Sequence, residues 1–173
     1  MPINIDKRKS KRPVRVYAVN TAPQSITLAD QNINFGTAIL DTYGAYSSFV
    51  GYFTAPSYGM YLISFSYQPI EQVGSPGTFI RLRTNIFQVK ASGGFFNHSF
   101  AIFTPNDAVR FEGKGSTGAN PENIRIPGSN TFIIELESGD AVQVRVNNRS
   151  GVKDFDIAPG ATLSVEKLNL RGD

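Results

Sequence analysis

The chain has 173 residues, a formal net charge of +3, 16 Gly, ten Pro and no Cys. Its length suits one well-buried core, and its composition suits a β domain with many turns. The lack of Cys excludes disulfides, thiolate metal sites and thiol nucleophiles, and no apolar stretch reaches the roughly 18 residues that a membrane-spanning helix needs.

The first residues form a strongly basic segment. Six of the 17 Lys and Arg residues lie within the first 15 positions, and Asp6 is the one acid among them. We predict an arm over residues 1–13, a folded domain over 14–170 and a short tail over 171–173. The arm could neutralise phosphates of a nucleic acid, dock on an acidic protein or capsid surface, or only increase solubility. Its basic residues are Lys7, Arg8, Lys9, Lys11, Arg12 and Arg15.

From Val14 onward, apolar and polar residues alternate with a period of two, and helical periodicity is absent. Clusters of Gly, Pro, Asn, Asp and Ser separate these runs. Short strands at this spacing predict an all-β sandwich or jelly roll. The predicted strands cover residues 14–19, 60–67, 78–89, 95–103, 108–113, 131–137, 141–146 and 161–168.

The strongest predicted strand follows a turn over residues 55–59. Pro56 fixes its own φ there, and Gly59 permits a backbone conformation that a Cβ would penalise. The strand from Met60 is apolar at nearly every position. We therefore expect it to lie centrally in a sheet with both of its faces covered.

Residues 33–66 resemble the signature of the complement C1q globular-head family, and residues 131–146 resemble its late hairpin, which contains a Gly-Asp pair. The resemblance implies a single-domain, ten-strand jelly-roll β-sandwich of the C1q and tumour necrosis factor (TNF) type, assembled as a homotrimer. It also implies Tyr61, Phe65 and Phe132 as candidates for the core or the trimer axis. The matching positions are Asn34, Phe35, Tyr46, Gly51, Phe53, Pro56, Gly59, Tyr61 and Gly139.

Residues that could support catalysis or metal binding are sparse. His98 is the only histidine, which leaves no histidine metal cluster and no evident catalytic triad. Asp154 and Asp156 could supply two oxygen ligands to calcium, or they could belong to a solvated loop. The C-terminal Arg-Gly-Asp, residues 171–173, matches an integrin-recognition motif, but a tripeptide also recurs by chance. We expect no enzyme and no required cofactor.

These features favour a binding or structural head over a catalyst. The leading hypothesis is a head, knob, spike or decoration subunit of a phage, viral or bacterial surface assembly, anchored by its basic arm. The start of the chain lacks an apolar signal core, so we expect synthesis in a reducing cytoplasm and a place in a virion or extracellular surface assembly. The alternative is a single-jelly-roll capsid protein whose arm binds the packaged genome.

Overall fold

The computed structural model describes residues 13–27, 30–71, 79–80, 82–98, 109–110, 128–148 and 155–169. The arm residues before Pro13, the tail 171–173 and Asp154 lie outside these ranges. No helix among the described residues is long and apolar enough to cross a membrane.

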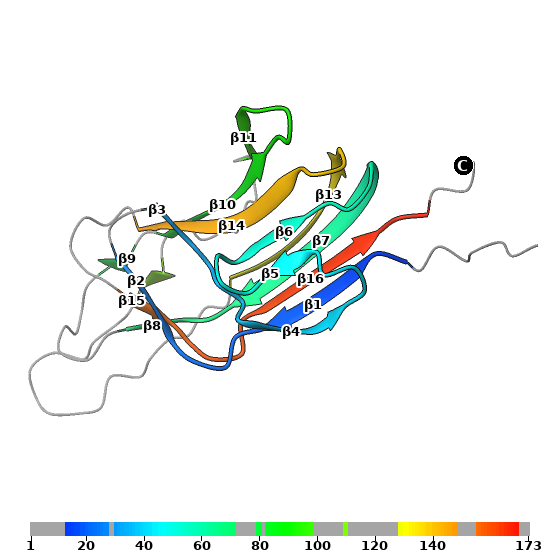
Figure 1. The fold of residues 1–173 in the computed structure, drawn as a ribbon. Helices are drawn as coiled ribbons and strands as arrows, with labels where there is room; N and C mark the ends of the chain where they lie inside the picture. Colours follow the sequence, from blue (N-terminus) through cyan, green and yellow to red (C-terminus); the bar gives the residue numbers. More distant parts are fainter. Residues whose placement is uncertain are drawn as a thin grey trace, which may run out of the picture.

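Two antiparallel sheets face each other as a sandwich (Figure 1). Sheet I has the order β13 (Gly128–Leu136), β7 (Gly59–Tyr67), β16 (Thr162–Lys167), β1 (Arg15–Val19) and β4 (Thr37–Asp41). Sheet II has the order β11 (Phe95–His98), β10 (Leu82–Val89), β14 (Ala141–Asn148), β6 (Tyr52–Thr54) and β5 (Tyr46–Ser47), and β3 (Asp30–Asn32) also pairs with β14. The five strands of sheet I and the five in the main path of sheet II form the expected jelly roll.

Two small sheets complete the described strands. One joins β2 (Gln24–Ile26), β15 (Phe155–Ile157) and β8 (Pro69–Glu71). The other pairs β9 (Phe79–Ile80) with β12 (Val109–Arg110). The sequence predicted one strand over 78–89, but the structure has β9 and β10 there, and these two strands pair in different sheets.

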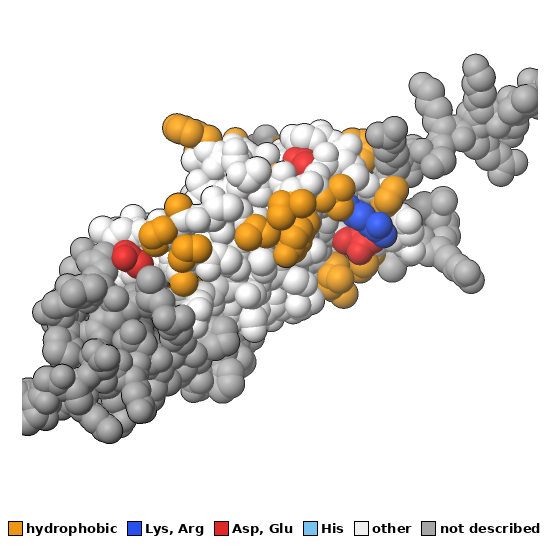
Figure 2. Space-filling view, turned by 90° about the horizontal axis from the view of Figure 1, so that it is seen from below, with side chains coloured by type: hydrophobic (Ala, Val, Ile, Leu, Met, Phe, Trp, Pro, Cys, Tyr) orange, Lys and Arg blue, Asp and Glu red, His pale blue; other side chains and the backbone are white. Residues whose placement is uncertain are grey.

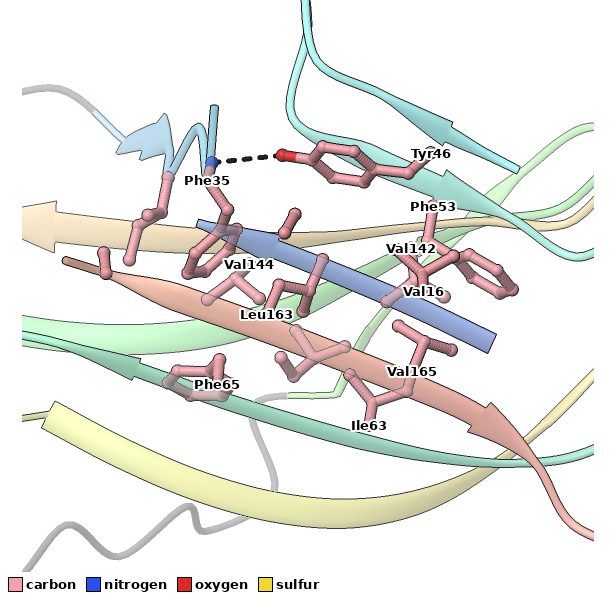
Figure 3. Packing of buried hydrophobic residues seen from close by; sticks show 14 of the residues in the cluster. Val16, Phe35, Tyr46, Phe53, Ile63, Phe65, Val142, Val144, Leu163 and Val165 are labelled. Atoms are coloured by element: carbon pink, nitrogen blue, oxygen red, sulfur yellow. Dashed lines mark hydrogen bonds between the residues drawn. The ribbon is translucent and has the colours of Figure 1, made fainter. Parts of the chain in front are cut away.

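The core lies between the two sheets and follows directly from the alternation in the sequence. In β7, Tyr61, Ile63, Phe65 and Tyr67 are buried because every second side chain points to the same face. Figure 3 shows Ile63 and Phe65 packed among other buried side chains between the two sheets. The facing residues include Val16, Leu163 and Val165 from sheet I and Phe53, Val142 and Val144 from sheet II.

The other face of β7 differs from the expectation. Met60, Leu62, Ser64 and Ser66 are only half-buried. The prediction that both faces of this strand are covered is wrong for a single chain. The physical reason is that, among the described residues, sheet II packs on one face of sheet I and nothing packs on the other.

Gly51 marks the point where two loops come closest. Its φ is 70°, and a Cβ added there would lie 2.8 Å from the carbonyl oxygen of Ile33 and 3.0 Å from the Cα of Asn34. Both contacts are with backbone, which cannot move aside as a side chain could. The same loop is fastened by the Asn34 amide, which donates from Nδ2 to the Ser48 carbonyl at 2.7 Å.

The Tyr46 side chain binds Phe35, the residue that follows Asn34. The Phe35 backbone amide donates to the Tyr46 hydroxyl oxygen at 3.1 Å (Figure 3). Burial raises the pKa of Tyr46 to about 12, against the opposing effect of that hydrogen bond. The side chain therefore stays neutral at physiological pH and can remain in the apolar interior.

Gly51→Ala should destabilise the domain by about 2 kcal/mol more than Gly44→Ala. Gly44 is the matched control, because its φ of 63° imposes the same backbone strain while nothing lies within 4 Å of its added Cβ. Chemical denaturation of the two variants measures the difference. Equal losses of stability would show that the approach of Ile33 and Asn34 to Gly51 does not constrain the fold.

Candidate interaction surfaces

Most of the sequence-predicted signature residues lie inside the domain. Phe35, Phe53 and Tyr61 are fully buried, and the rings of Phe53 and Tyr61 are 5.4 Å apart. Phe65 is also buried, so Tyr61 and Phe65 both belong to the core of the single chain. Phe132 is different, because it is only half-buried on β13, the last strand of sheet I, where it meets Phe65 edge-on at 6.3 Å.

The turn before β7 is shaped by local contacts. The Tyr61 hydroxyl donates to the Ser57 carbonyl at 2.6 Å, which ties the strand back to its own turn. Gly59 has a φ of 157°, and its added Cβ would lie 2.4 Å from Cε of Lys167. Pro56 is half-buried in the same turn. These contacts position β7.

The Gly-Asp turn between β13 and β14 contains a buried ionic centre. Asp140 is 1% exposed and accepts hydrogen bonds from Lys90 Nζ at 2.9 Å and from Gln88 Nε2 at 2.7 Å. The backbone amides of Ala91 and Glu137 also donate to it, at 3.0 and 3.1 Å. Gly139 supplies the positive φ of 89° that the turn requires.

This centre joins the β13–β14 turn to the end of β10. Burial alone would raise the pKa of Asp140, but the hydrogen bonds from Lys90, the two amides and Gln88 outweigh burial and lower the pKa from 3.8 to about 2. The sequence analysis missed this role. The partners of Asp140 are about 50 residues away along the chain, and a Gly-Asp pair by itself predicts only a turn.

The outer face of sheet I, the face turned away from sheet II, carries exposed apolar side chains. The strand register places Glu166, Leu62 and Ile133 side by side in one row. Leu40 and Tyr17 lie opposite each other in the next row. Tyr17 is 40% exposed, Leu40 44% and Ile133 56%. Viewed from below the orientation of Figure 1, hydrophobic side chains gather beside an adjoining pair of basic and acidic groups (Figure 2).

Two pairs of polar groups on this face bind each other within the chain. Arg15 Nη2 and Nε donate to Glu166 at 2.8 and 3.0 Å, and the hydroxyls of Ser64 and Thr131 are hydrogen-bonded at 2.9 Å. Arg15, which the sequence analysis grouped with the basic arm, therefore lies in β1 with its charge compensated. The other arm residues lie outside the described residues.

The described residues place neither calcium candidate, Asp154 or Asp156, in a metal site. Asp156 lies in β15 between the buried Phe155 and Ile157. Asp154 falls outside the described ranges, as does the side chain of His98 in β11. Among the residues that the structure describes, no group of three or more His, Cys, Asp or Glu side chains could hold a metal ion.

Comparison with known proteins identifies the fold. No protein-family model and no curated protein matches the sequence. Similar solved structures include the globular domain of zebrafish complement 1qA protein, with a TM-score of 0.59, 14% identity, and coverage of 91% of this chain and 98% of that one. Murine APRIL matches with a TM-score of 0.57, 12% identity, and coverage of 91% and 100%. The Eiger TNF of S. frugiperda matches with a TM-score of 0.54, 11% identity, and coverage of 93% and 96%.

The ionisation of Asp140 should give the domain a defined sensitivity to acid. Its pKa is lower in the folded than in the unfolded chain, so its contribution is fully present above the unfolded pKa of 3.8 and is lost as the pH falls toward 2. At neutral pH that contribution is about 2 kcal/mol. Asp140→Asn should therefore be destabilised at pH 7, and its deficit relative to the parent should shrink between pH 4 and about 2.

Denaturant unfolding of parent and variant over this pH range provides the measurement. Carboxyl groups elsewhere titrate in both proteins, so the difference between the two isolates Asp140. A deficit that stays constant from neutral to acidic pH would contradict the role assigned to the carboxylate.

Proposed function

Because the chain has the jelly-roll fold of the C1q and TNF structures, we propose that it is a non-enzymatic homotrimeric binding or structural module. It serves as a head, knob, spike or decoration subunit of a phage, viral or bacterial surface assembly, located in a virion or at an extracellular surface. Its basic N-terminal arm anchors it. The observation that carries the proposal is the exposed apolar outer face of sheet I.

This face and the neighbouring edge of the sheet are suited to a ring of identical subunits. Tyr17, Leu40, Leu62 and Ile133 offer an apolar sheet face, while Phe132 offers an apolar group at the edge of the sheet, on β13. Two different patches on one subunit make a heterologous contact, and such contacts form a ring when the rotation between subunits closes. Three copies would each place an edge against the face of the next.

Burying this face costs little in unsatisfied polar groups. Arg15 and Glu166 neutralise each other, and Ser64 and Thr131 share a hydrogen bond. A buried polar group costs most when it lacks a partner, and a hydrogen bond within the pair offsets part of the cost of removing both groups from water. The apolar area that a partner covers would therefore contribute to assembly with little opposing desolvation of unpaired groups.

The composition of the arm supports electrostatic anchoring. Lys7, Arg8, Lys9, Lys11 and Arg12 precede the first described residue, and like charges at this density carry almost no apolar area to bury. An anionic partner would compensate them. The same concentration of basic residues favours the second candidate function, a single-jelly-roll capsid protein whose arm binds the packaged genome.

Ile133→Lys should dissociate the trimer into monomers, because assembly would bury an unpaired ammonium group. Val89→Lys is the matched control. Like Ile133, Val89 is an exposed β-branched residue in a strand, with 36% of its surface exposed, but it lies on sheet II. Light scattering after size-exclusion chromatography gives the masses. The proposal fails if Ile133→Lys keeps the mass of the parent, or if Val89→Lys loses it.

Deleting residues 1–12 should leave the fold and the trimer intact and abolish attachment to an anionic partner. The deletion leaves Arg15, whose charge is held by Glu166. Full-length and shortened proteins are offered nucleic acid and the acidic surface of a parent particle, at low and high salt. Attachment by the full-length protein should weaken steeply with salt.

Nucleic acid and the particle surface, tested side by side, distinguish the head or knob from the capsid protein. Docking on the particle without binding to nucleic acid favours the head or knob, whereas retention of nucleic acid by the full-length protein alone favours the capsid protein. An arm whose removal unfolds the trimer, or changes neither interaction, is not an anchor.

A further inference from the structure

The outer face of sheet II, the face turned away from sheet I, carries a guanidinium group that has no acidic partner among the described residues. Arg145 lies on β14, and among the described residues its hydrogen bonds go to neutral oxygen atoms. Nε donates to Asn32 Oδ1 at 3.0 Å, and Nη2 donates to Gln143 Oε1 at 2.8 Å. The two amides hold the planar group in one orientation, which lowers the entropy cost of binding through it.

Aromatic rings continue this surface from the guanidinium toward the edge of the sheet. The Arg145 guanidinium carbon lies 3.7 Å from the centre of the Phe87 ring. The Phe87 ring stacks on that of Phe95, with centroids 5.3 Å apart and an interplanar angle of 26°. Phe95 is 69% exposed, so it offers a flat apolar ring, with the Phe87 ring between it and the fixed cation.

The side-chain oxygens beside Arg145 are already occupied. The side-chain oxygens of Asn32 and Gln143 already accept hydrogen bonds from Arg145. Within the described residues, neither Arg145 Nη1 nor Gln143 Nε2 has a hydrogen-bond partner. The face therefore presents N–H groups and a positive charge, which together suit an anion with several oxygen acceptors.

Among the side chains that the structure describes on and beside β10 and β14, Lys90 is the one cation besides Arg145. Lys90, at the end of β10, is bound to Asp140. Arg145 thus stands as an isolated cation in its row, whereas a nucleic acid requires several cations to neutralise successive phosphates.

We propose that the outer face of sheet II binds a carboxylated sugar, such as a uronic acid residue of a polysaccharide. The carboxylate lies against Arg145 and Gln143, and the apolar face of the sugar ring packs on Phe95. A sugar ring holds its carboxylate rigidly beside a flat C–H surface, whereas the side chain of an acidic peptide must be ordered on binding. The inference rests on the proposed role of the domain as a binding head, and it names the ligand class of that head.

The trimer would strengthen such a shallow site. One half-buried cation and one exposed ring give only weak binding, but three sites on one head can engage a repeating polysaccharide at once. A repeating ligand fits this surface better than an isolated monosaccharide does.

The test uses the full-length protein and two matched probes. One is an oligosaccharide that contains glucuronic acid, and the other is the same oligosaccharide with its carboxyl groups reduced to alcohols. Isothermal titration calorimetry should show binding of the acidic probe and at least about tenfold weaker binding of the reduced one. Polyglutamate serves as the peptide alternative and should bind more weakly than the acidic sugar.

Three variants locate the site. Arg145→Gln should weaken binding of the acidic probe at least about tenfold. Arg145→Lys keeps the charge but loses the planar fork, so it should also weaken binding of the acidic probe. Phe95→Ser should weaken this binding too, and because Phe95 is exposed the substitution should leave the fold intact. Lys167→Gln, which removes the same charge from sheet I, is the control and should bind as the parent does.

The inference is overturned if the acidic probe does not bind, or if the reduced probe or polyglutamate binds as tightly as it does. It is also overturned if Arg145→Gln binds the acidic probe as tightly as the parent does. Light scattering on the same samples separates this result from the proposed function. A trimer that ignores the sugar overturns only the ligand class, whereas a monomer that binds it overturns only the assembly.

Discussion

Within the described residues, sheet I has a partner layer on one face only, and this constraint decides which of its apolar residues remain open to other chains. Tyr61, Ile63 and Phe65 close the interior against sheet II, while Leu62 on the same strand points away from it. Leu62 continues into a row with Ile133, and Tyr17 lies on the same outer face. A β-sandwich buries two inner faces, so apolar residues on an outer face need a further partner. Other copies of the same chain supply that partner in the proposed trimer.

The two outer faces differ in the chemistry that they offer. Polar groups on sheet I are paired with one another, as Arg15 is with Glu166, which suits a surface that becomes buried. On sheet II, Arg145 is held by neutral amides and keeps its charge available. One face is therefore suited to assembly and the other to an anionic ligand. The loops between them are fixed by side chains that bind backbone, as Asn34 and Asp140 do.

The sequence predicted the strands where alternation and turns coincide, as at β7, and the C1q- and TNF-like fold is confirmed by the solved structures. It could not separate core from outer face for Tyr61, Phe65 and Phe132, because a period of two shows that two faces exist but not what covers each. The Asp140 centre and the Arg145 site were missed for another reason. Both depend on residues that are distant in the chain and meet only through strand register, such as Asn32 and Arg145.

The central claim is that folding and assembly of this domain are coupled through the outer face of sheet I. The most direct measurement is the thermal unfolding temperature of the unaltered full-length protein over about a hundredfold range of concentration. Mass action requires that temperature to rise with concentration when a folded trimer dissociates into unfolded chains. We expect such a rise, together with a mass near three times 18.9 kDa before unfolding. A monomer whose unfolding temperature is the same at every concentration would contradict it.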